Sequence, residues 1–179
     1  MDQLSSIHIR PYEHGDAEAL FEAARESLST VGAWLWWCTP EFTREAAKAW
    51  VDRQVMAFQS RSAFEFVICN SAGRFLGGCG LNVIDEGNAR ANLGYWVRAS
   101  ETGHGVVTEA TRLLARWAFQ NTELIRLEIV VAKDNLASLR VAENVGAVRE
   151  GILRQRLRIQ GELQDAILFS ILKSDVDLI

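Results

Sequence analysis

Cysteine and histidine are scarce in this chain of 179 residues. The cysteines show no paired short spacing, which argues against a disulfide framework or a zinc knuckle and suits a reducing cytoplasm; they are Cys38, Cys69 and Cys79. The histidines are scattered as well, so the sequence offers no metal site. We therefore expect a cytoplasmic protein without a bound metal.

Long apolar runs and a strong charge of one sign are also missing. No run approaches the ~20 residues that span a bilayer, and the N-terminus has no apolar core of the signal-peptide type. The net charge of −4 at pH 7 disfavours a general electrostatic grip on nucleic acid. No long linker or repeat interrupts the chain, so we expect one domain over residues 1–179, with neither a membrane nor a nucleic acid as partner.

Hydrophobic periodicity, in contrast, is clear along the whole chain. Alternation and short apolar runs predict strands over residues 6–12, 63–69, 75–84, 91–99 and 124–132, and two more around a turn at 160–162. Helical spacing predicts helices over 16–28, 43–59, 106–118 and 135–146, with Asp16 as an N-cap and Gly146 just after a helix end. This order predicts an α/β fold with a mixed sheet, because three successive strands read as antiparallel.

A glycine-rich turn precedes the clearest of these helices. Gly103 and Gly105 in "ETGHGVVTEA" allow backbone N–H groups at the helix start to converge on an anion such as a pyrophosphate. The alternative is that the glycines only make the turn. A dinucleotide site fits less well, because Thr108 stands where a third glycine is needed, and no Lys-Ser or Lys-Thr follows as in a phosphate-loop NTPase.

Two blocks of sequence carry a family resemblance. "GYWVRASETGHGVVTEA" resembles the central motif of the GNAT acetyltransferase superfamily, with Thr102 and Val107 departing from its usual residues. "NLASLRVAENVGAVREGILR" resembles the RimJ/RimL branch, which acetylates the N-termini of ribosomal proteins. The matching residues are Asn135, Ser138, Gly146, Glu150, Gly151 and Arg154, followed by Gly161 and Asp165. The resemblance implies a GNAT fold of about seven strands, largely antiparallel in its N-terminal half, with about four helices.

The resemblance also implies acetyl-CoA as cofactor and a set of residues that hold it. The strand Tyr95, Trp96 and Val97 would pair its backbone with the pantetheine arm, and a free N–H there would meet the oxyanion. The turn would cradle the pyrophosphate; it comprises Thr102, Gly103, His104, Gly105, Val106, Val107 and Thr108. Asn135 would cap its helix and contact the cofactor. For the His104 side chain we favour a solvent-facing position.

Acetyl transfer also needs a proton donor for the leaving thiolate and a neutral amine. The resemblance makes Ser138 the candidate acid, the alternative being plain N-terminal helix chemistry; the usual tyrosine of the family is replaced by Ala142. The glutamate that parts of the branch use as a base is replaced by Leu157. Glu128 is one candidate base, although pairing with an arginine such as Arg126 or Arg154 is the more common role of a strand carboxylate.

The acceptor side is read from the loops. Glu86 and Asp85, which follow the third predicted strand, are further candidates for the base, and Glu86 is also assigned to the acceptor side. Trp34, Trp36 and Trp37 would wall the acceptor cleft of a GNAT fold or pack in the core. The alternation in "RQRLR" places Arg154, Arg156 and Arg158 on one face, either solvated or turned toward an acidic partner or a coenzyme phosphate.

Three functions remain open from the sequence. The first is acetylation of a protein N-terminal α-amine, as on a ribosomal protein, by direct attack in a ternary complex. The second is acetylation of a small amine such as a polyamine, amino acid or antibiotic. The third is a non-catalytic module that binds acyl-CoA, since a fold does not fix a function. We expect a monomer or a homodimer.

Overall fold

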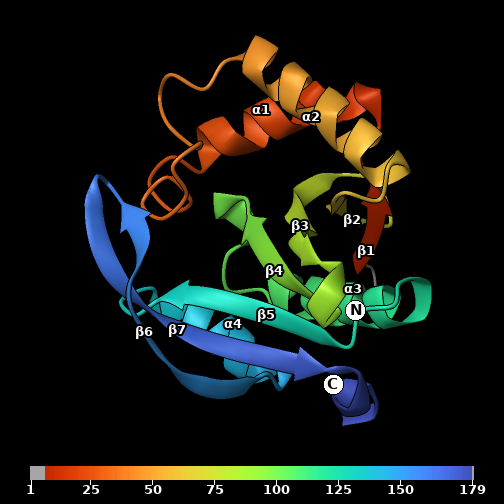
Figure 1. Ribbon diagram of the computed structural model, residues 1–179. Helices are drawn as coiled ribbons and strands as arrows, with labels where there is room; N and C mark the ends of the chain where they lie inside the picture. Colours follow the sequence, from red (N-terminus) through yellow and green to blue (C-terminus); the bar gives the residue numbers. More distant parts are fainter. Residues whose placement is uncertain (1–6, 179) are drawn as a thin grey trace.

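The computed structural model describes residues 7–178 and has the predicted order of strands and helices (Figure 1). The strands are β1 (Ile7–Pro11), β2 (Phe64–Asn70), β3 (Phe75–Asp85), β4 (Arg90–Val97), β5 (Arg126–Ala132), β6 (Val148–Ile159) and β7 (Glu162–Leu172). The helices are α1 (Ala17–Glu26), α2 (Arg44–Gln59), α3 (Val106–Asn121) and α4 (Leu136–Val145). Residues 1–6 and 179 of the predicted domain, among them Ser6 of the first predicted strand, lie outside the described residues.

Residues 7–178 also contain four short 3-10 helices, which were not predicted. They are η2 (His14–Asp16), η3 (Glu86–Asn88), η4 (Ala99–Glu101) and η5 (Lys173–Leu178). The aromatic segment between α1 and α2 forms successive turns, in which Val31 O accepts from the N–H groups of Trp34 and Leu35. No helix of the described residues is long and apolar enough to cross a membrane.

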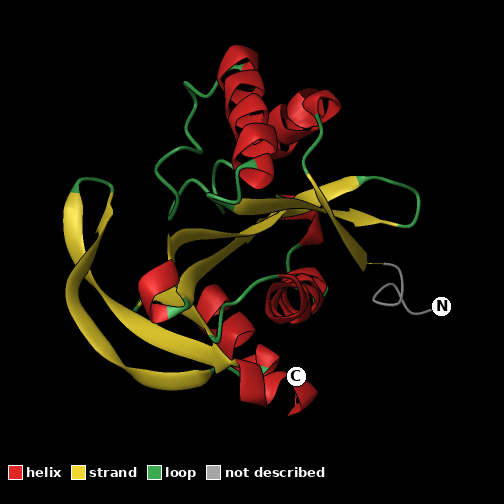
Figure 2. Ribbon diagram, turned by 45° about the vertical axis from the view of Figure 1, so that its right-hand side comes forward, coloured by secondary structure: helices red, strands yellow, loops and turns green. Residues whose placement is uncertain are grey.

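The seven strands form one sheet in the order β1-β2-β3-β4-β5-β7-β6. Each neighbouring pair is antiparallel except β4 and β5, which run parallel. Helices α1 and α2 cover one face of the sheet, and α3 and α4 lie on the other (Figures 1 and 2). The predicted mixed sheet with an antiparallel first half is therefore confirmed.

Strand β2 shows how the sequence builds the two apolar layers. Phe66 and Ile68 pack in the cluster that includes Leu114 of α3, whereas Val67 packs with Leu20 of α1 and Val51 of α2. This alternation follows from the two-residue period of a strand that is covered on both faces. It also tells us that every second residue from Glu65 onward faces α1 and α2.

The predicted capping positions at Asp16 and Gly146 agree with the structure. Thr43 is the N-cap of α2 and accepts from Ala46 N at 3.1 Å, and Gly146 closes α4 with φ +95°. Asp16 stands before α1, but its carboxylate accepts from Arg10 at 2.6 Å and from Glu13 N at 2.8 Å. Asp16 is therefore the N-cap residue of α1 by position, as predicted, but it makes no side-chain capping hydrogen bond, because the arginine and the preceding 3-10 turn take up its carboxylate.

The last two strands form a long curved hairpin (Figure 2). Its turn has positive φ at Gln160 and Gly161, as tight two-residue hairpin loops require. In β6 the pairing with β7 shifts between Leu153 and Leu157, and Gln155 there has φ +50°. This irregularity breaks the simple alternation that the sequence predicted for this strand.

Candidate active site

The sheet opens between its two parallel strands. β4 and β5 pair only where Arg90–Asn92 meets Arg126–Glu128. Beyond that point, residues Leu93–Val97 and Ile129–Ala132 line a cavity of about 1070 Å³. No strand of the described residues pairs with the β4 edge that faces this gap, so its backbone donors and acceptors are available to an extended ligand. The volume lies at the upper end of the range for small-molecule sites.

The start of α3 forms one wall of the cavity and is built to receive an anion. Gly103 and Gly105 have φ of +83° and +75°, which explains the glycines at these positions. No backbone N–H from Gly103 to Thr108 donates a hydrogen bond within residues 7–178, and Gly105 caps α3 without a side-chain partner. These free N–H groups and the helix dipole attract negative charge. Thr102, Gly103 and Gly105 to Thr108 line the cavity, whereas His104 is exposed outside its lining.

Two hydroxyl groups meet on the same side of the gap. Asn135 caps α4 by accepting from Ser138 N at 3.1 Å, which fixes Ser138 in the first turn as predicted. The Ser138 Oγ lies 3.0 Å from the Tyr95 phenol, which also donates to Ser138 O at 3.1 Å. Burial raises the pKa of Tyr95 to about 12, so its phenol keeps its proton at neutral pH. The sequence had assigned only the backbone of Tyr95 to the site.

Tryptophan side chains line the opposite part of the cavity. Trp34, Trp36, Trp37 and Trp50 belong to this lining, and Trp36 is 85% exposed at its mouth. Trp37 also packs edge-on against Trp96, with ring centroids 5.4 Å apart. For Trp37 the two alternatives, cleft wall and core packing, both apply, because it belongs to a small apolar cluster and also lines the cavity.

A carboxylate that the sequence analysis missed lies in the same region. Glu65 of β2 lines the cavity and accepts from Asn82 Nδ2 at 3.2 Å, and Asn82 Oδ1 accepts from Asn92 Nδ2 at 2.9 Å. Burial raises the pKa of Glu65 from its ordinary value of 4.5 to about 7, although the hydrogen bond from Asn82 acts in the opposite direction. A charged residue between Phe64 and Phe66, on a face shared with Val67, was the available signal in the sequence.

Comparison with known proteins identifies this arrangement. The family model described as "Acetyltransferase (GNAT) domain" matches residues 6–148. The chain belongs to the GNAT acetyltransferase family. This acetyltransferase is accordingly an enzyme that depends on acetyl-CoA, and the open β4 edge and the free N–H groups at the start of α3 fit such a cofactor.

The relatives of this acetyltransferase include proteins that act on ribosomal proteins. It is 32% identical over 174 residues to the Bacillus subtilis (strain 168) protein named "Putative ribosomal N-acetyltransferase YdaF", covering 94% of this chain and 92% of that one. It is 30% identical to the ribosomal-protein-serine acetyltransferase of Escherichia coli (strain K12), covering 73% and 74%. The solved structure of RimL, a ribosomal L7/L12 alpha-N-protein acetyltransferase in complex with coenzyme A, has the same fold, with a TM-score of 0.86 over 94% of both chains at 21% identity.

Two predicted carboxylates of the acetyltransferase do not line the cavity. Glu128 accepts from Arg90 at 3.0 Å and from Arg126 at 2.8 Å, which is the ion-paired role that the sequence left open for it. Glu86 is exposed in η3. Neither carboxylate is among the described residues that line the cavity. The structure thus brings the predicted cofactor residues and tryptophans together, except His104, and leaves these two glutamates outside.

The pairing of β6 with β7 shifts within the run that carries its arginines. Gln155 N donates to Asp165 Oδ1 at 2.9 Å, which holds the irregular segment in place. Arg156 and Leu157, which are neighbours in the chain, both line the cavity, and Arg158 donates to Gly161 O at 2.7 Å. All three arginines are exposed, and of the three only Arg156 lines the cavity.

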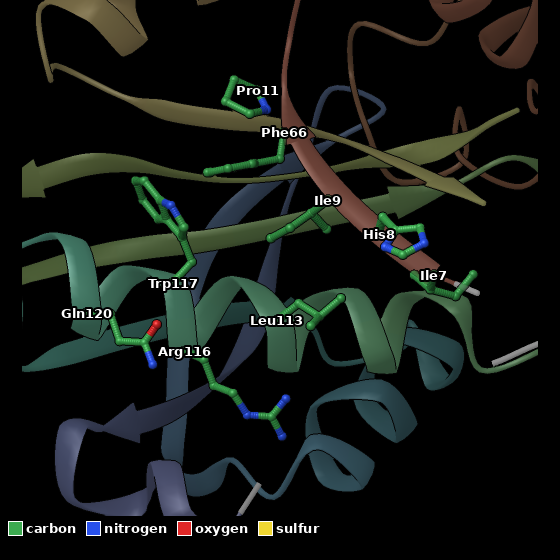
Figure 3. Close-up of a pocket in the computed structure, with 9 residues that line it drawn as sticks. All are labelled: Ile7, His8, Ile9, Pro11, Phe66, Leu113, Arg116, Trp117 and Gln120. Carbon is green, nitrogen blue, oxygen red and sulfur yellow. The ribbon is translucent and has the colours of Figure 1, made fainter. Parts of the chain in front are cut away.

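A second, smaller hollow of about 450 Å³ lies between β1 and α3 (Figure 3). Its lining is mainly apolar and shares no residue with the larger cavity; it consists of Ile7, His8, Ile9, Pro11, Phe66, Leu113, Arg116, Trp117 and Gln120. It lacks the open edge of β4 and the free N–H groups at the start of α3. We therefore place the candidate active site of the acetyltransferase in the larger cavity.

Proposed function

We propose that this enzyme acetylates the N-terminal α-amine of a protein, and that a ribosomal protein is the acceptor. The observation that carries the proposal is the single cavity, in which the Tyr95–Val97 edge and the start of α3 adjoin an acceptor wall of tryptophans. Both substrates can occupy such a cavity together, which supports direct attack in a ternary complex. The names of the relatives in Bacillus subtilis and Escherichia coli support the ribosomal acceptor. The cytoplasm, where ribosomes lie, is the expected location.

The cofactor half of the cavity would hold acetyl-CoA, which supplies an activated acetyl thioester when it is bound. The backbone of Tyr95–Val97 would pair with the pantetheine arm, and one N–H of this edge would donate to the thioester oxygen. The free backbone N–H groups of residues 103–108 would hold its pyrophosphate. Positioning two substrates in this way lowers the barrier by removing much of the entropy loss of their encounter.

Ser138 is the proposed proton donor on this side of the sheet. Its Oγ lines the cavity and contacts the Tyr95 phenol, so the two hydroxyls share the protons that reach the leaving thiolate. Tyr95, which lies on β4, thereby supplies the phenol that the family usually has at the position of Ala142. Asn135 keeps Ser138 in position through the helix cap.

The acceptor half receives the protein N-terminus. Trp34 and Trp36 lie at the wall and mouth, where flat side chains offer apolar area and an N–H to an extended peptide. In Figures 1 and 2 the tip of the β6–β7 hairpin approaches the segment between α1 and α2, and Arg156 from this hairpin lines the cavity. We propose that one domain over residues 1–179 carries the activity, as a monomer or a homodimer.

The test is acetyl transfer from acetyl-CoA followed by mass spectrometry. One acceptor pool contains peptides with the N-termini of ribosomal proteins, and a second contains polyamines, amino acids and aminoglycosides. We expect a gain of one acetyl group on particular peptides, at the α-amine only. The same peptides with a blocked N-terminus and an internal lysine are the control and should stay unlabelled. Labelling confined to the small amines would contradict the protein acceptor.

A further inference from the structure

Glu65 lies on the opposite face of the sheet from Ser138. In the strand pairing Glu65 stands opposite Gly80 of β3, and Gly80 stands opposite Gly94 of β4. Residues directly opposite each other in antiparallel strands share a face, which here is the face of α1 and α2. Tyr95, the next residue of β4, points to the other face, where its phenol meets Ser138. The gap between β4 and β5 connects the two.

The two glycines keep the way from Glu65 to this gap open. A Cβ at Gly80 would overlap the Glu65 carboxylate, so the carboxylate lies across β3 over Gly80. At Gly94 a Cβ would have Asn92 Nδ2 as its nearest neighbour, at 3.9 Å, so the space above this residue is open. Adjacent strands are ~4.8 Å apart. A nitrogen above Gly94, at the edge of the gap, is therefore within reach of the carboxylate directly or through one water molecule.

Among the neighbouring groups named below, Glu65 is the one whose charge changes near neutral pH. Tyr12 and Cys79 interact with it electrostatically, and burial raises the pKa of both well above their ordinary values, so both stay neutral. Asn82, its hydrogen-bond partner, carries no charge. The charged side chains elsewhere in the cavity lining are Glu101, Arg140 and Arg156.

We propose that Glu65 is the catalytic base that removes a proton from the acceptor ammonium. The ammonium nitrogen gives one proton to a Glu65 carboxylate oxygen, directly or through water; the N–H bond breaks, an O–H bond forms, and the nitrogen keeps the electron pair with which it attacks the thioester. Glu65 then returns its proton to solvent through the open mouth of the cavity. An α-ammonium has a pKa near ~8, so a base that titrates near neutral pH suits this transfer.

This inference rests on the acetyl-transfer activity and on the cavity of the proposed function, and it holds for a peptide or a small amine. It replaces the candidates Glu128 and Glu86, which the structure places outside the cavity lining. It also explains why Leu157 can stand where parts of the RimL branch carry a glutamate. The base lies on β2 instead of β6, and both strands contribute to the same cavity.

The experiment compares the wild type with Glu65→Gln, an isosteric change that keeps a partner for Asn82. We measure kcat and kcat/KM from about pH 6 to about pH 9.5, on either side of the α-amine pKa, with whichever amine of the two pools is best labelled. We expect Glu65→Gln to lower kcat near neutral pH by about 100-fold or more. In this variant the fall of the rate on the acidic side of the pH profile, near pH 7, should disappear. Raising the pH should recover much of its rate, because the amine then loses its proton unaided.

Glu128→Gln is the matched control, since it changes another strand carboxylate that lies outside the cavity lining. It should retain the acidic limb near pH 7. A readout without substrates is the infrared spectrum of the free enzyme, in which a carboxyl band should titrate near pH 7 in the wild type and be missing from Glu65→Gln. A Glu65→Gln enzyme with kcat within twofold of the wild type and an unchanged pH profile would overturn the proposal. If only small amines are labelled, the protein acceptor fails but the same comparison still decides the role of Glu65.

Discussion

The Ser138 hydroxyl either delivers a proton or only belongs to the first turn of α4, and removing its Oγ distinguishes these two roles. If Ser138 only belongs to the first turn of α4, its removal costs little, because Asn135 caps the helix through the Ser138 backbone N–H. If its Oγ delivers a proton, Ser138→Ala should lower kcat by about 100-fold or more while the affinity for coenzyme A changes little. Steady-state kinetics and calorimetric titration with coenzyme A measure the two quantities.

Two further variants calibrate this result. Tyr95→Phe removes the second hydroxyl but leaves the Ser138 Oγ, so we expect a smaller loss of kcat. Ser62→Ala removes an exposed hydroxyl after α2 and should leave both quantities unchanged. Equal kcat in Ser138→Ala and the wild type would refute the proton-donor role and leave Ser138 only its structural role in the first turn of α4.

Single residues also show what the sequence could and could not tell. The cap at Asn135 and the position of Ser138 were predictable, because capping is local and depends on residues three apart. The Tyr95–Ser138 contact joins residues 43 positions apart, and Glu65 reaches the cavity only because two glycines on neighbouring strands leave room for it. No local pattern encodes the register that brings these glycines opposite Glu65.

At the scale of elements, the turn before α3 gives a direct test of the anion site. Gly103 has φ +83° and an added Cβ would meet nothing within 4 Å, so the methyl group of Gly103→Ala would project into open space at the cavity. We expect the affinity for coenzyme A to fall by about tenfold, as for the loss of one hydrogen bond to a charged group. Calorimetric titration with coenzyme A measures the change.

The matched control is Gly73→Ala in the turn between β2 and β3. Gly73 has φ +79° and equally open surroundings, but it is not part of the cavity lining. Both variants should lose about 1–2 kcal/mol of folding free energy, because an alanine at positive φ is strained. Only Gly103→Ala should bind coenzyme A more weakly; the same loss of affinity in both variants would show that general destabilisation is the cause.

The elements themselves were mostly predictable, and the exceptions have a common reason. Order and type of all the strands and the four longer helices followed from periods of two and 3.6 residues, which are local properties. The irregular stretch of β6 was not predictable, because it depends on Asp165 of β7 accepting from Gln155 N. Asp16 is the N-cap residue of α1 as predicted, but its lack of a capping hydrogen bond has the same reason: its partner Arg10 belongs to another element.

For the whole molecule, the decisive feature is a sheet that is continuous but open at its centre. The three pairs between β4 and β5 hold its two halves together, and the divergence beyond them creates the cavity. Residues from both faces thereby reach one space, with Ser138 on the side of α4 and Glu65 on the side of α1 and α2. A covered sheet normally separates its faces, so this opening is what allows an acid and a base on opposite faces to serve one reaction.

Two other carboxylates, Glu26 and Glu150, affect how the stability of the molecule depends on pH. Hydrogen bonds from Ser100 and Arg98 lower the pKa of Glu26 to about 2, and those from Arg126 and Ser170 lower that of Glu150 to about 2. A lowered pKa in the folded state means that stability is present above about pH 4.5 and is lost as the pH falls toward 2. These groups therefore make the enzyme less stable in acid.

Glu65 acts in the opposite direction and gives the molecule an unusual loss of stability on the neutral side. Its folded-state pKa is raised from 4.5 to about 7, so its contribution is full below pH 4.5 and is lost as the pH rises toward 7. This change in pKa corresponds to about 3 kcal/mol. The stability of Glu65→Gln minus that of the wild type should therefore be larger at about pH 7.5 than at about pH 4.5. Urea unfolding of both proteins at the two pH values measures this difference. A parallel decline in the two proteins would show that Glu65 titrates normally in the folded enzyme, and the carboxylate could then not serve as a base tuned to neutral pH by burial.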